Sequence, residues 1–296
     1  AAEARDIAGR LAKIAEEAEL LVHEMDFRFL YNAKRKMLSV GFNIEQNELL
    51  ESCYDLLASE ARSAVFAAIA KGDIPQISWF QLGRVHTHFA GRSVLLSWTG
   101  TMFEYLMPML WMKTYPETLL ENSMSGAVAS QRAVVEKMEI PWGISEGSSS
   151  MRNDAGHYDY HAFGVKALAL KVDLPKRLVI TPYAAFLALN VDPAGAVRNL
   201  RQMQKQNWMG PLGFYESADY GRPKRGDALR PEIVRSWMAH HQGMSLLSVA
   251  NLLSNEIFQR LFHEEVMVAA TERILHERKP SITNSEPATA TEEWLS

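Results

Sequence analysis

Apolar residues near the start of the chain recur at the spacing of an α-helix. They follow one another at steps of four and three: Ile7, Leu11, Ile14, Ala18 and Leu21. This spacing places them on one face of a helix whose opposite face is charged. Two heptads are too few for a coiled coil, so we interpret residues 1–25 as an N-terminal helix and linker.

The hydrophobic pattern of the remaining chain predicts mainly helices. Residues 27–43 alternate apolar and polar positions and predict one small β-hairpin. The alanine-rich stretch 54–71 has helical periodicity and stops at Gly72. Further helices are predicted at residues 97–113, 123–138, 193–207, 231–254 and 256–278. The pattern therefore predicts an all-α domain with a small N-terminal β-hairpin.

Long connections rich in aromatic residues and glycine separate the predicted helices, at residues 75–92, 140–164, 174–192 and 208–230. Long connections in a compact helical domain tend to be functional, because their backbone polar groups need partners that helices supply for themselves. We expect the chemistry of the protein there. Residues 280–296 are rich in Ser, Thr, Ala, Glu and Pro, and predict a disordered tail.

Composition and charge narrow the possible partners. With 47% hydrophobic residues in 296, the chain is neither disordered nor fibrous. Its 31 basic and 35 acidic side chains are scattered, which leaves no electrostatic footprint for nucleic acid, so no nucleic-acid partner is expected. A single cysteine, Cys53, excludes an internal disulfide. The first 22 residues lack the pattern of an export signal.

One apolar stretch, residues 93–112, is long enough to suggest a membrane span. It carries Glu104, Gly100 and Pro108 near its middle, and an ionisable residue there is costly in lipid. We therefore interpret the stretch as a buried helix that holds a polar site.

Carboxylates flanked by aromatic residues and glycines recur in three segments: Glu104 in WTGTMFEYLMP, Glu146 in PWGISEG, and Glu216 with Asp219 in GFYESADY. Sugars present apolar C–H faces and many hydroxyls, so aromatic faces beside carboxylates are typical of a saccharide site. Cleavage of a glycosidic bond needs one carboxyl group kept protonated by apolar surroundings and a second one ionised. An isolated glutamate more often caps a helix, but three such segments together favour a saccharide site.

Two other motifs are set aside. Residues 143–147 match the G-x-S-x-G pattern of hydrolases, but a helix and Pro141 lead into Ser145 where that motif needs a strand. The adjacent His240 and His241 point about 100° apart on a helix, so they cannot share a metal ion without outside ligands. We expect no metal and no cofactor.

Several spaced strings resemble one known family: YDLLASEAR, WFQLGR, SWTGTMFEYLMP, WGISEG, ITPYAAFLALNVDPAGAVRNL, GPLGFYESADY and MAHHQGMSLLSVANLL. Together they resemble the glycoamylase-like domain of bacterial cyclic β-1,2-glucan synthases, in glycoside hydrolase family 189. The likeness assigns residues 26–279 to that catalytic domain. It implies an (α/α)6 toroid-like barrel, lying between a glycosyltransferase and a phosphorylase-like domain in the cytoplasmic part of a bacterial inner-membrane protein.

The resemblance also implies a reaction. Linear β-1,2-glucan would be cyclised by anomer-retaining transglycosylation through a glycosyl-enzyme intermediate, with Glu146 as nucleophile and Glu216 as acid/base. For retention by direct attack we expect the carboxyl groups to lie about 5–5.5 Å apart, whereas about 6.5–9.5 Å fits inversion by water. A proton relayed through a substrate hydroxyl could widen the gap. Candidate sugar-stacking residues are Trp98, Trp142, Tyr183, Tyr215 and Tyr220. Candidate hydroxyl-binding residues are Asp55, Glu60, Glu104, His161, Asp219, His240 and Gln242.

Two alternatives stay open, as do the roles of Asp154 and His157. An endo-β-1,2-glucanase that hydrolyses with inversion could use the same residues, and its products would have reducing ends in place of rings. A non-catalytic module would bind β-1,2-glucan without turning it over.

Overall fold

The computed structural model describes residues 2–223 and 229–278, so the predicted tail at 280–296 lies outside the described residues. The chain divides into two compact units. Unit 1 contains Ala1–Asp55 and Ala64–Gln81, and unit 2 contains Leu56–Ser63 and Leu82–Ser296. Except for Asp55, every predicted site residue belongs to unit 2. No helix in the described part of the chain is both long and apolar enough to cross a membrane.

Unit 1 begins with the helix that the first residues predict, α1 (Ala2–Glu24), and its apolar stripe is exposed. The predicted hairpin is present as β1 (Tyr31–Asn32) paired with β2 (Met37–Leu38). A second small hairpin follows, formed by β3 (Phe42–Asn43) and β4 (Glu48–Leu49). The Lys71 ammonium donates hydrogen bonds to the carbonyls of Val22 and Met25, which ties the end of α1 to the segment after α2.

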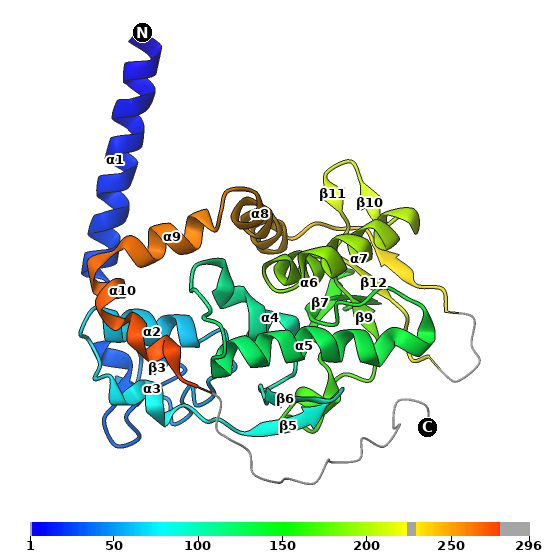
Figure 1. Ribbon diagram of the computed structural model, residues 1–296, viewed down its shortest axis with the longest axis horizontal. Coiled ribbons are helices and arrows are strands. Elements are labelled where there is room, and N and C mark those ends of the chain that lie inside the picture. The colour runs from blue at the N-terminus through cyan, green and yellow to red at the C-terminus, as the bar shows by residue number, and fades with distance from the viewer. Residues whose placement is uncertain (1, 224–228, 279–296) are drawn as a thin grey trace. The chain divides into compact units, whose positions relative to one another are not determined.

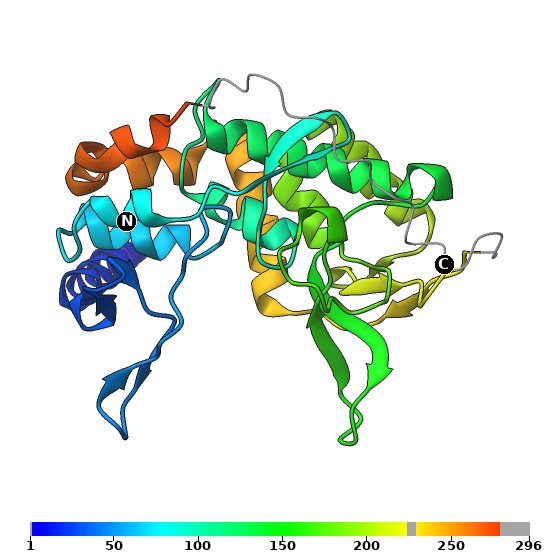
Figure 2. The ribbon, with the colours of Figure 1, turned by 90° about the horizontal axis from the view of Figure 1, so that it is seen from below.

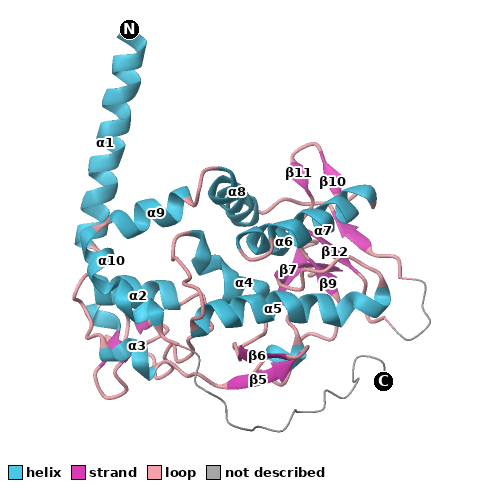
Figure 3. Ribbon diagram, viewed as in Figure 1, coloured by secondary structure: helices cyan, strands magenta, loops and turns pink. Residues whose placement is uncertain are grey.

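Helices dominate the structure, as the cyan ribbons of Figure 3 show. The remaining α-helices are α2 (Arg62–Ala70), α3 (Ile77–Gln81), α4 (Met102–Leu106), α5 (Leu119–Val135), α6 (Pro182–Leu187), α7 (Pro193–Lys205), α8 (Ala239–Leu253), α9 (Ile257–Glu264) and α10 (Val266–Thr271). The 3₁₀ helices are Arg28–Leu30, Met107–Leu110, Glu136–Met138, Lys166–Leu168, Ala188–Asn190 and Glu272–His276.

Small antiparallel sheets connect the helices of unit 2. The two-stranded ones pair β5 (His86–Phe89) with β6 (Arg92–Leu95), β7 (Glu146–Arg152) with β8 (Tyr158–Ala162), and β10 (Met209–Gly210) with β11 (Gly213–Phe214). A three-stranded sheet has the order β13 (Glu232–Val234), β12 (Ser217–Asp219), β9 (Val179–Ile180). The sequence pattern predicted one hairpin, so these strands were missed. Most of them lie within the expected connections, but β6 begins at the end of one, and β13 lies within the helix expected over 231–254.

The short helix α6 lies at the centre of unit 2. It packs against α4, α7 and α8, and Figure 1 shows it between the latter two. Five of its six residues are buried, including Tyr183 and Leu187. A helix that is apolar on all sides is stable only inside a core. Pro182 occupies the first turn, where its missing N–H costs no hydrogen bond, so α6 starts at a defined residue.

Three predicted helices begin later than the periodicity suggested. Residues 54–61 are not helical, and α2 starts at Arg62. The Ser59 hydroxyl accepts a hydrogen bond from the Ala61 N–H and so competes with helix formation there. The helix expected over 97–113 starts only at Met102, and the one expected over 231–254 starts at Ala239, after strand β13. Gly72 follows α2 with φ +77°, as a helix-terminating glycine does.

Candidate active site

Glu146 is the first residue of β7 and is half-buried. In the antiparallel register it lies opposite Ala162 of β8, and the hairpin extends from the helices of unit 2 as the green ribbon in Figure 2. Burial, the largest cause, and the negative charges of Glu60 and Glu104 together raise the pKa of Glu146 to about 7, and the Tyr160 hydroxyl offsets part of this rise. Near neutral pH, Glu146 can therefore hold a proton and release it.

Glu216 immediately precedes β12 and is only 2% exposed. Among the described residues, each of its carboxyl oxygens contacts one polar group. Oε1 accepts a hydrogen bond from the Ser148 N–H at 3.2 Å, and Oε2 lies 2.9 Å from His241 Nδ1. A Cβ atom at Gly147 would lie 2.7 Å from Thr181 Cγ2 and 3.3 Å from Glu216 Oε1, so the glycine of β7 permits this close approach.

His241 connects Glu216 to the β7–β8 hairpin. Its ring stacks on Tyr183 with centroids 3.8 Å apart and planes inclined by 15°. Its Nε2 lies 3.3 Å from the Tyr160 hydroxyl, and the same hydroxyl lies near the Glu146 carboxyl and lowers its pKa. The side chains form a continuous line from one candidate carboxyl to the other: Glu216, His241, Tyr160, Glu146. One can act as a proton donor, and the other is a buried acceptor.

Sequence reasoning did not predict that Tyr160 and His241 join the two carboxyls. It named His240, His241 and Gln242 as possible donors to substrate hydroxyls, but kept only His240 and Gln242 as site residues. The buried positions of α8 recur at helical spacing from His241 through Met244, Ser245 and Ser248, so the periodicity of the helix could have identified His241 as its inward-facing histidine. Tyr160 depends on strand pairing within the predicted loop 140–164, which the pattern did not reveal.

The G-x-S-x-G serine has a structural role. The Ser145 hydroxyl accepts a hydrogen bond from the Phe103 N–H at 3.0 Å and lies 2.8 Å from the Tyr183 hydroxyl. A strand, β7, begins directly after Ser145, whereas a hydrolase elbow requires a strand before the serine and a helix after it. These bonds hold the Tyr183 ring under His241.

Glu104 has a different role from the one expected. We predicted that it binds substrate hydroxyls, but it forms a capping box with Thr101 at the start of α4. Its carboxylate accepts hydrogen bonds from the hydroxyls of Ser97, Thr99 and Thr101 and from the backbone N–H groups of Thr99 and Thr101. Since it is 4% exposed and already bonded to these donors, its contacts indicate a structural role.

Asp219 also differs from the prediction of a substrate-binding residue. It is buried in an ion pair with Arg177, with the Nη2–Oδ2 distance 2.7 Å. It accepts further bonds from the N–H groups of Ser150 and Gly221. Although burial would raise its pKa, the Arg177 guanidinium and these N–H groups hold that pKa below its usual value. The carboxylate thus ties β7 to β12, the strands next to the two glutamates.

The other predicted residues of unit 2 differ in accessibility. Trp98 is 57% exposed and lies in the loop whose hydroxyl and N–H groups bind the Glu104 carboxylate. His161 and His240 are exposed, and Glu60 is half-buried with a pKa raised by burial. Asp154 and His157 are exposed in the turn between β7 and β8.

Three more predicted residues have described contacts within unit 2. The Tyr215 ring lies 5.1 Å from that of Trp237, and Tyr220 is largely buried beside Trp208. The Gln242 amide donates to the Phe214 carbonyl at 3.2 Å. Asp55, the predicted residue in unit 1, is exposed and pairs with Arg35 at 3.7 Å.

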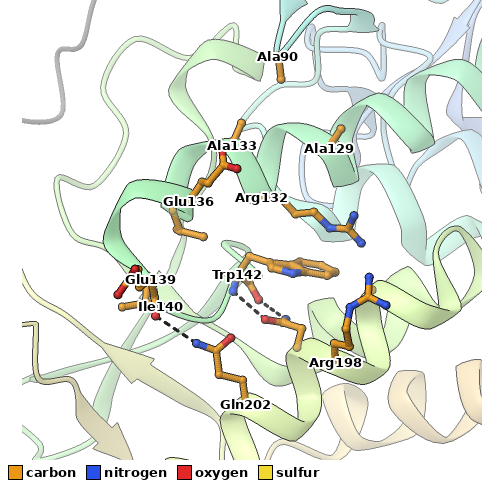
Figure 4. A pocket seen from close by; sticks show the side chains of 13 residues that line it. Ala90, Ala129, Arg132, Ala133, Glu136, Glu139, Ile140, Trp142, Arg198 and Gln202 are labelled. Atoms are coloured by element: carbon orange, nitrogen blue, oxygen red, sulfur yellow. Dashed lines mark hydrogen bonds between the residues drawn. The ribbon is translucent and has the colours of Figure 1, made fainter.

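Trp142 lines a separate cavity of about 630 Å³. The cavity residues come mainly from α5 and α7 and do not include Glu146 or Glu216. Figure 4 shows Arg132 and Arg198 on either side of the indole, and the Arg132 guanidinium lies 5.4 Å from the ring centroid. The ring itself is only 7% exposed, so its faces are occupied by protein groups.

The described residues contain no group of three or more His, Cys, Asp or Glu side chains arranged to hold a metal ion.

Known proteins resemble this chain in sequence and in fold. Cyclic β-(1,2)-glucan synthase NdvB of Rhizobium meliloti is 39% identical over 271 residues, which are 92% of this chain and 10% of that protein. The chain thus spans about a tenth of the length of this relative. This similarity confirms the resemblance to cyclic β-1,2-glucan synthases that the sequence strings indicated.

Solved structures share the fold at low sequence identity. An endo-β-1,2-glucanase from Chitinophaga pinensis, in complex with sophorotriose and glucose, has a TM-score of 0.69 and 16% identity, covering 92% of this chain and 66% of its own. A putative glucoamylase from Bacteroides caccae has a TM-score of 0.66 and 17% identity, covering 90% and 65%. An endo-β-1,2-glucanase mutant from Talaromyces funiculosus, solved with β-1,2-glucan, has a TM-score of 0.63 and 14% identity, covering 90% and 59%.

The family assignment rests on a match within the chain. The protein-family model described as "Glycoamylase: Putative glucoamylase" matches residues 53–266, which include Glu146, Glu216 and the residues that join them. The match covers well over half of the chain, and the chain belongs to the glycoamylase family.

Proposed function

We propose that this chain is a glycoside hydrolase-type enzyme that acts on β-1,2-glucan, and that it cyclises the linear glucan by anomer-retaining transglycosylation. Its sequence likeness to a cyclic β-(1,2)-glucan synthase supports the substrate and the cyclising reaction. Its fold likeness to endo-β-1,2-glucanases agrees with the same substrate class.

The observation that carries the proposal is the pair of carboxyls joined by His241 and Tyr160. Glycosidic cleavage needs one carboxylic acid that remains protonated near neutral pH and one carboxylate that does not. Glu146, with its pKa raised to about 7 by burial and by neighbouring acids, supplies the first. Glu216, which accepts hydrogen bonds from Ser148 and His241, supplies the second.

These surroundings favour the opposite assignment of roles from the one we expected from the family resemblance. We propose Glu146 as the acid/base and Glu216 as the nucleophile. A nucleophile must be ionised, and donors fixed on both oxygens of Glu216 stabilise that form. A general acid works best when its pKa lies near the working pH, which is the situation of Glu146.

In the proposed reaction, Glu146 gives its proton to the glycosidic oxygen while Glu216 attacks the anomeric carbon. The glycosidic bond breaks, and a glycosyl ester forms on Glu216. Ionised Glu146 then takes the proton from a hydroxyl at the other end of the same glucan, and that oxygen displaces Glu216 to close the ring. This second step succeeds only where acceptor residues orient the sugar and keep water away. The exposed indole of Trp98 is one candidate for that purpose.

The proposal extends to the surroundings of the domain. We propose that residues 26–279 form an (α/α)6 toroid and act as one module of a larger synthase. Its neighbours would be a glycosyltransferase and a phosphorylase-like domain, on the cytoplasmic side of a bacterial inner membrane. The relative tenfold longer than this chain agrees with such an arrangement.

The test is to incubate the purified chain with linear β-1,2-glucan and to weigh the products. Cyclisation gives species lighter by one water than the linear glucan of the same length. Replacement of Glu146 or Glu216 by Gln should lower kcat about a thousandfold or more while circular dichroism stays unchanged. Glu232→Gln is the matched control, because Glu232 is an exposed glutamate on β13, in the same sheet as β12. A folded Glu146→Gln or Glu216→Gln protein with wild-type activity would refute the pair.

A second candidate is an inverting endo-β-1,2-glucanase, and the fold likeness to two endo-β-1,2-glucanases favours it. The same incubation separates the two candidates. Hydrolysis yields shorter glucans with new reducing ends and no ring-sized species, and the anomer first released, followed by NMR, reports inversion.

A further inference from the structure

His241 is only 2% exposed, and its imidazole ring has three neighbouring side chains. Its Nδ1 faces Glu216, its Nε2 faces Tyr160, and its ring lies flat on Tyr183. Ser145 anchors the Tyr183 hydroxyl from behind. A histidine held in this way has one available orientation, so the atoms on either side of it are held as well.

The hydrogen positions follow from what each group can donate. A carboxylate only accepts hydrogen bonds, so Nδ1 carries the proton that points to Glu216. In the neutral ring Nε2 is then an acceptor, and its partner within reach is the Tyr160 hydroxyl. The same phenol oxygen can accept a hydrogen bond from Glu146 while Glu146 is protonated.

We infer that His241 and Tyr160 are positioning residues that couple the two carboxyls. In this inference, His241 holds Glu216 in its attacking position, and the Tyr160 hydroxyl turns from His241 to Glu146 when Glu146 has released its proton. The inference rests on the proposed function, because it assigns work to residues that act through Glu146 and Glu216.

The turning step moves no proton from one residue to another. While Glu146 is protonated, its O–H points to the Tyr160 oxygen, and the Tyr160 O–H points to His241 Nε2. Once Glu146 has protonated the leaving oxygen, its carboxylate can only accept. The Tyr160 O–H then rotates about the C–O bond and donates to Glu146, which stabilises the ionised state that must next act as a base.

The coupling predicts a specific pH effect. The groups that face Glu146 are Glu60, Glu104, Tyr160 and Tyr183, and of these the Tyr160 hydrogen bond lowers the pKa of Glu146. Loss of this hydroxyl therefore raises the pKa of Glu146. Activity depends on the protonated acid, so the basic limb of the pH–rate profile moves to higher pH. A residue that only supported the fold would change the height of the profile and leave its limbs in place.

The experiment compares Tyr160→Phe with Tyr158→Phe in the full chain. Tyr158 lies two residues away on the same strand, and its ring packs under the Arg152 guanidinium. For Tyr160→Phe we expect kcat to fall about 10- to 100-fold with KM within about twofold, since one hydrogen bond to a charged group is lost. We also expect the basic limb to rise by about half a pH unit or more. Tyr158→Phe should reproduce the wild-type profile, and an unmoved limb in Tyr160→Phe overturns the inference.

A carboxyl ¹³C NMR titration measures the same pKa without turnover. The Glu146 resonance is assigned by its absence in Glu146→Gln. If the wild type is inactive on β-1,2-glucan, the proposed function fails, and the titration still decides the inference. A Glu146 pKa that is higher in Tyr160→Phe than in the wild type supports it, and an equal pKa overturns it.

Two substitutions test His241 itself. Asn places its amide nitrogen close to the position of Nδ1, so His241→Asn keeps a donor for Glu216, whereas His241→Phe keeps the ring on Tyr183 but provides no donor. We expect the kcat of His241→Asn to be higher than that of His241→Phe by about tenfold or more, at similar KM. Equal kcat in two variants that both fold, as judged by circular dichroism, overturns the role assigned to His241.

Discussion

Glu104 and Glu146 occupy two neighbouring regions of unit 2 and illustrate two uses of a poorly exposed glutamate. On the loop before α4, the hydroxyls and N–H groups of Ser97, Thr99 and Thr101 surround the Glu104 carboxylate. At the start of β7, the Tyr160 hydroxyl is the neighbour that lowers the pKa of the Glu146 carboxyl, against burial and the charges of Glu60 and Glu104. The first carboxylate is fully engaged by the fold, and the second remains available.

The difference shows that burial alone does not identify a catalytic acid. Desolvation disfavours the charged form of Glu146 and raises its pKa. Where the chain supplies many donors, the carboxylate is a structural element. Where it supplies few, and where other acids lie near, the proton is retained, and the group can serve as a general acid. Glu104 contributes to both regions, because its charge helps to raise the pKa of Glu146.

The largest expected effect that separates these regions is on stability. Glu104→Ala leaves the donors of the 97–101 loop without their acceptor and removes half of the α4 capping box, so the free energy of unfolding should fall by about 2–4 kcal/mol. Urea denaturation followed by circular dichroism measures this change. Glu121→Ala, which removes an acidic residue from the first turn of α5, is the control and should cost about 0.5 kcal/mol or less. Equal losses for the two variants would contradict a special role of Glu104.

A smaller effect should appear at Glu146, with the opposite sign. Its pKa is about 7 in the folded chain against an ordinary value of 4.5, so between these values the folded state holds a proton that the unfolded state has lost. The contribution of Glu146 to stability is thus complete below about pH 4.5 and declines as the pH rises through 7. Glu146→Gln removes this penalty, and we expect it to gain about 1–2 kcal/mol relative to the wild type between pH 5 and pH 8, after discounting for solvent.

Thermal or urea unfolding of both proteins at pH 5 and pH 8 measures that gain. Glu232→Gln, at an exposed position of β13, should show no pH-dependent difference from the wild type. A Glu146→Gln difference that is the same at both pH values would mean that Glu146 titrates normally, and the comparison with Glu104 would lose its basis.

Much of the helical content could be predicted from the sequence, because apolar spacing and capping residues within one segment are enough to form a helix. The steps of four and three in residues 7–21 correspond to α1, and Asp192 followed by Pro193 starts α7 as a cap and first-turn proline do. Even the structural role of Glu104 had a local signal, since Thr101 and Glu104 match the spacing of a capping box. The aromatic residues around Glu104 give a competing signal, which favours a saccharide site.

The remainder depends on contacts between distant segments. Tyr160 and His241 are 81 positions apart in the sequence, and Arg177 and Asp219 are 42 positions apart. The local sequence around these residues therefore contains no signal that they are in contact. The β7–β8 hairpin lay inside a stretch that reads as a glycine-bearing polar loop, because its outer face is solvated. The two carboxyls could be proposed from composition, whereas the residues that join them required the three-dimensional structure.

The smallest expected effect concerns the loop of residues 97–101, which the Glu104 carboxylate holds and which exposes Trp98 to solvent. The indole is 57% exposed while the neighbouring Ser97 and Thr99 are buried, so the loop fixes an aromatic surface that contributes little to the core. If Trp98 stacks on glucan, Trp98→Ala should raise KM about three- to tenfold, leave kcat nearly unchanged and alter stability by less than about 0.5 kcal/mol. Phe80→Ala, another exposed aromatic of the chain, is the matched control. Steady-state kinetics on linear β-1,2-glucan measure the split, and an unchanged KM would restrict this loop to the structural role that Glu104 already gives it.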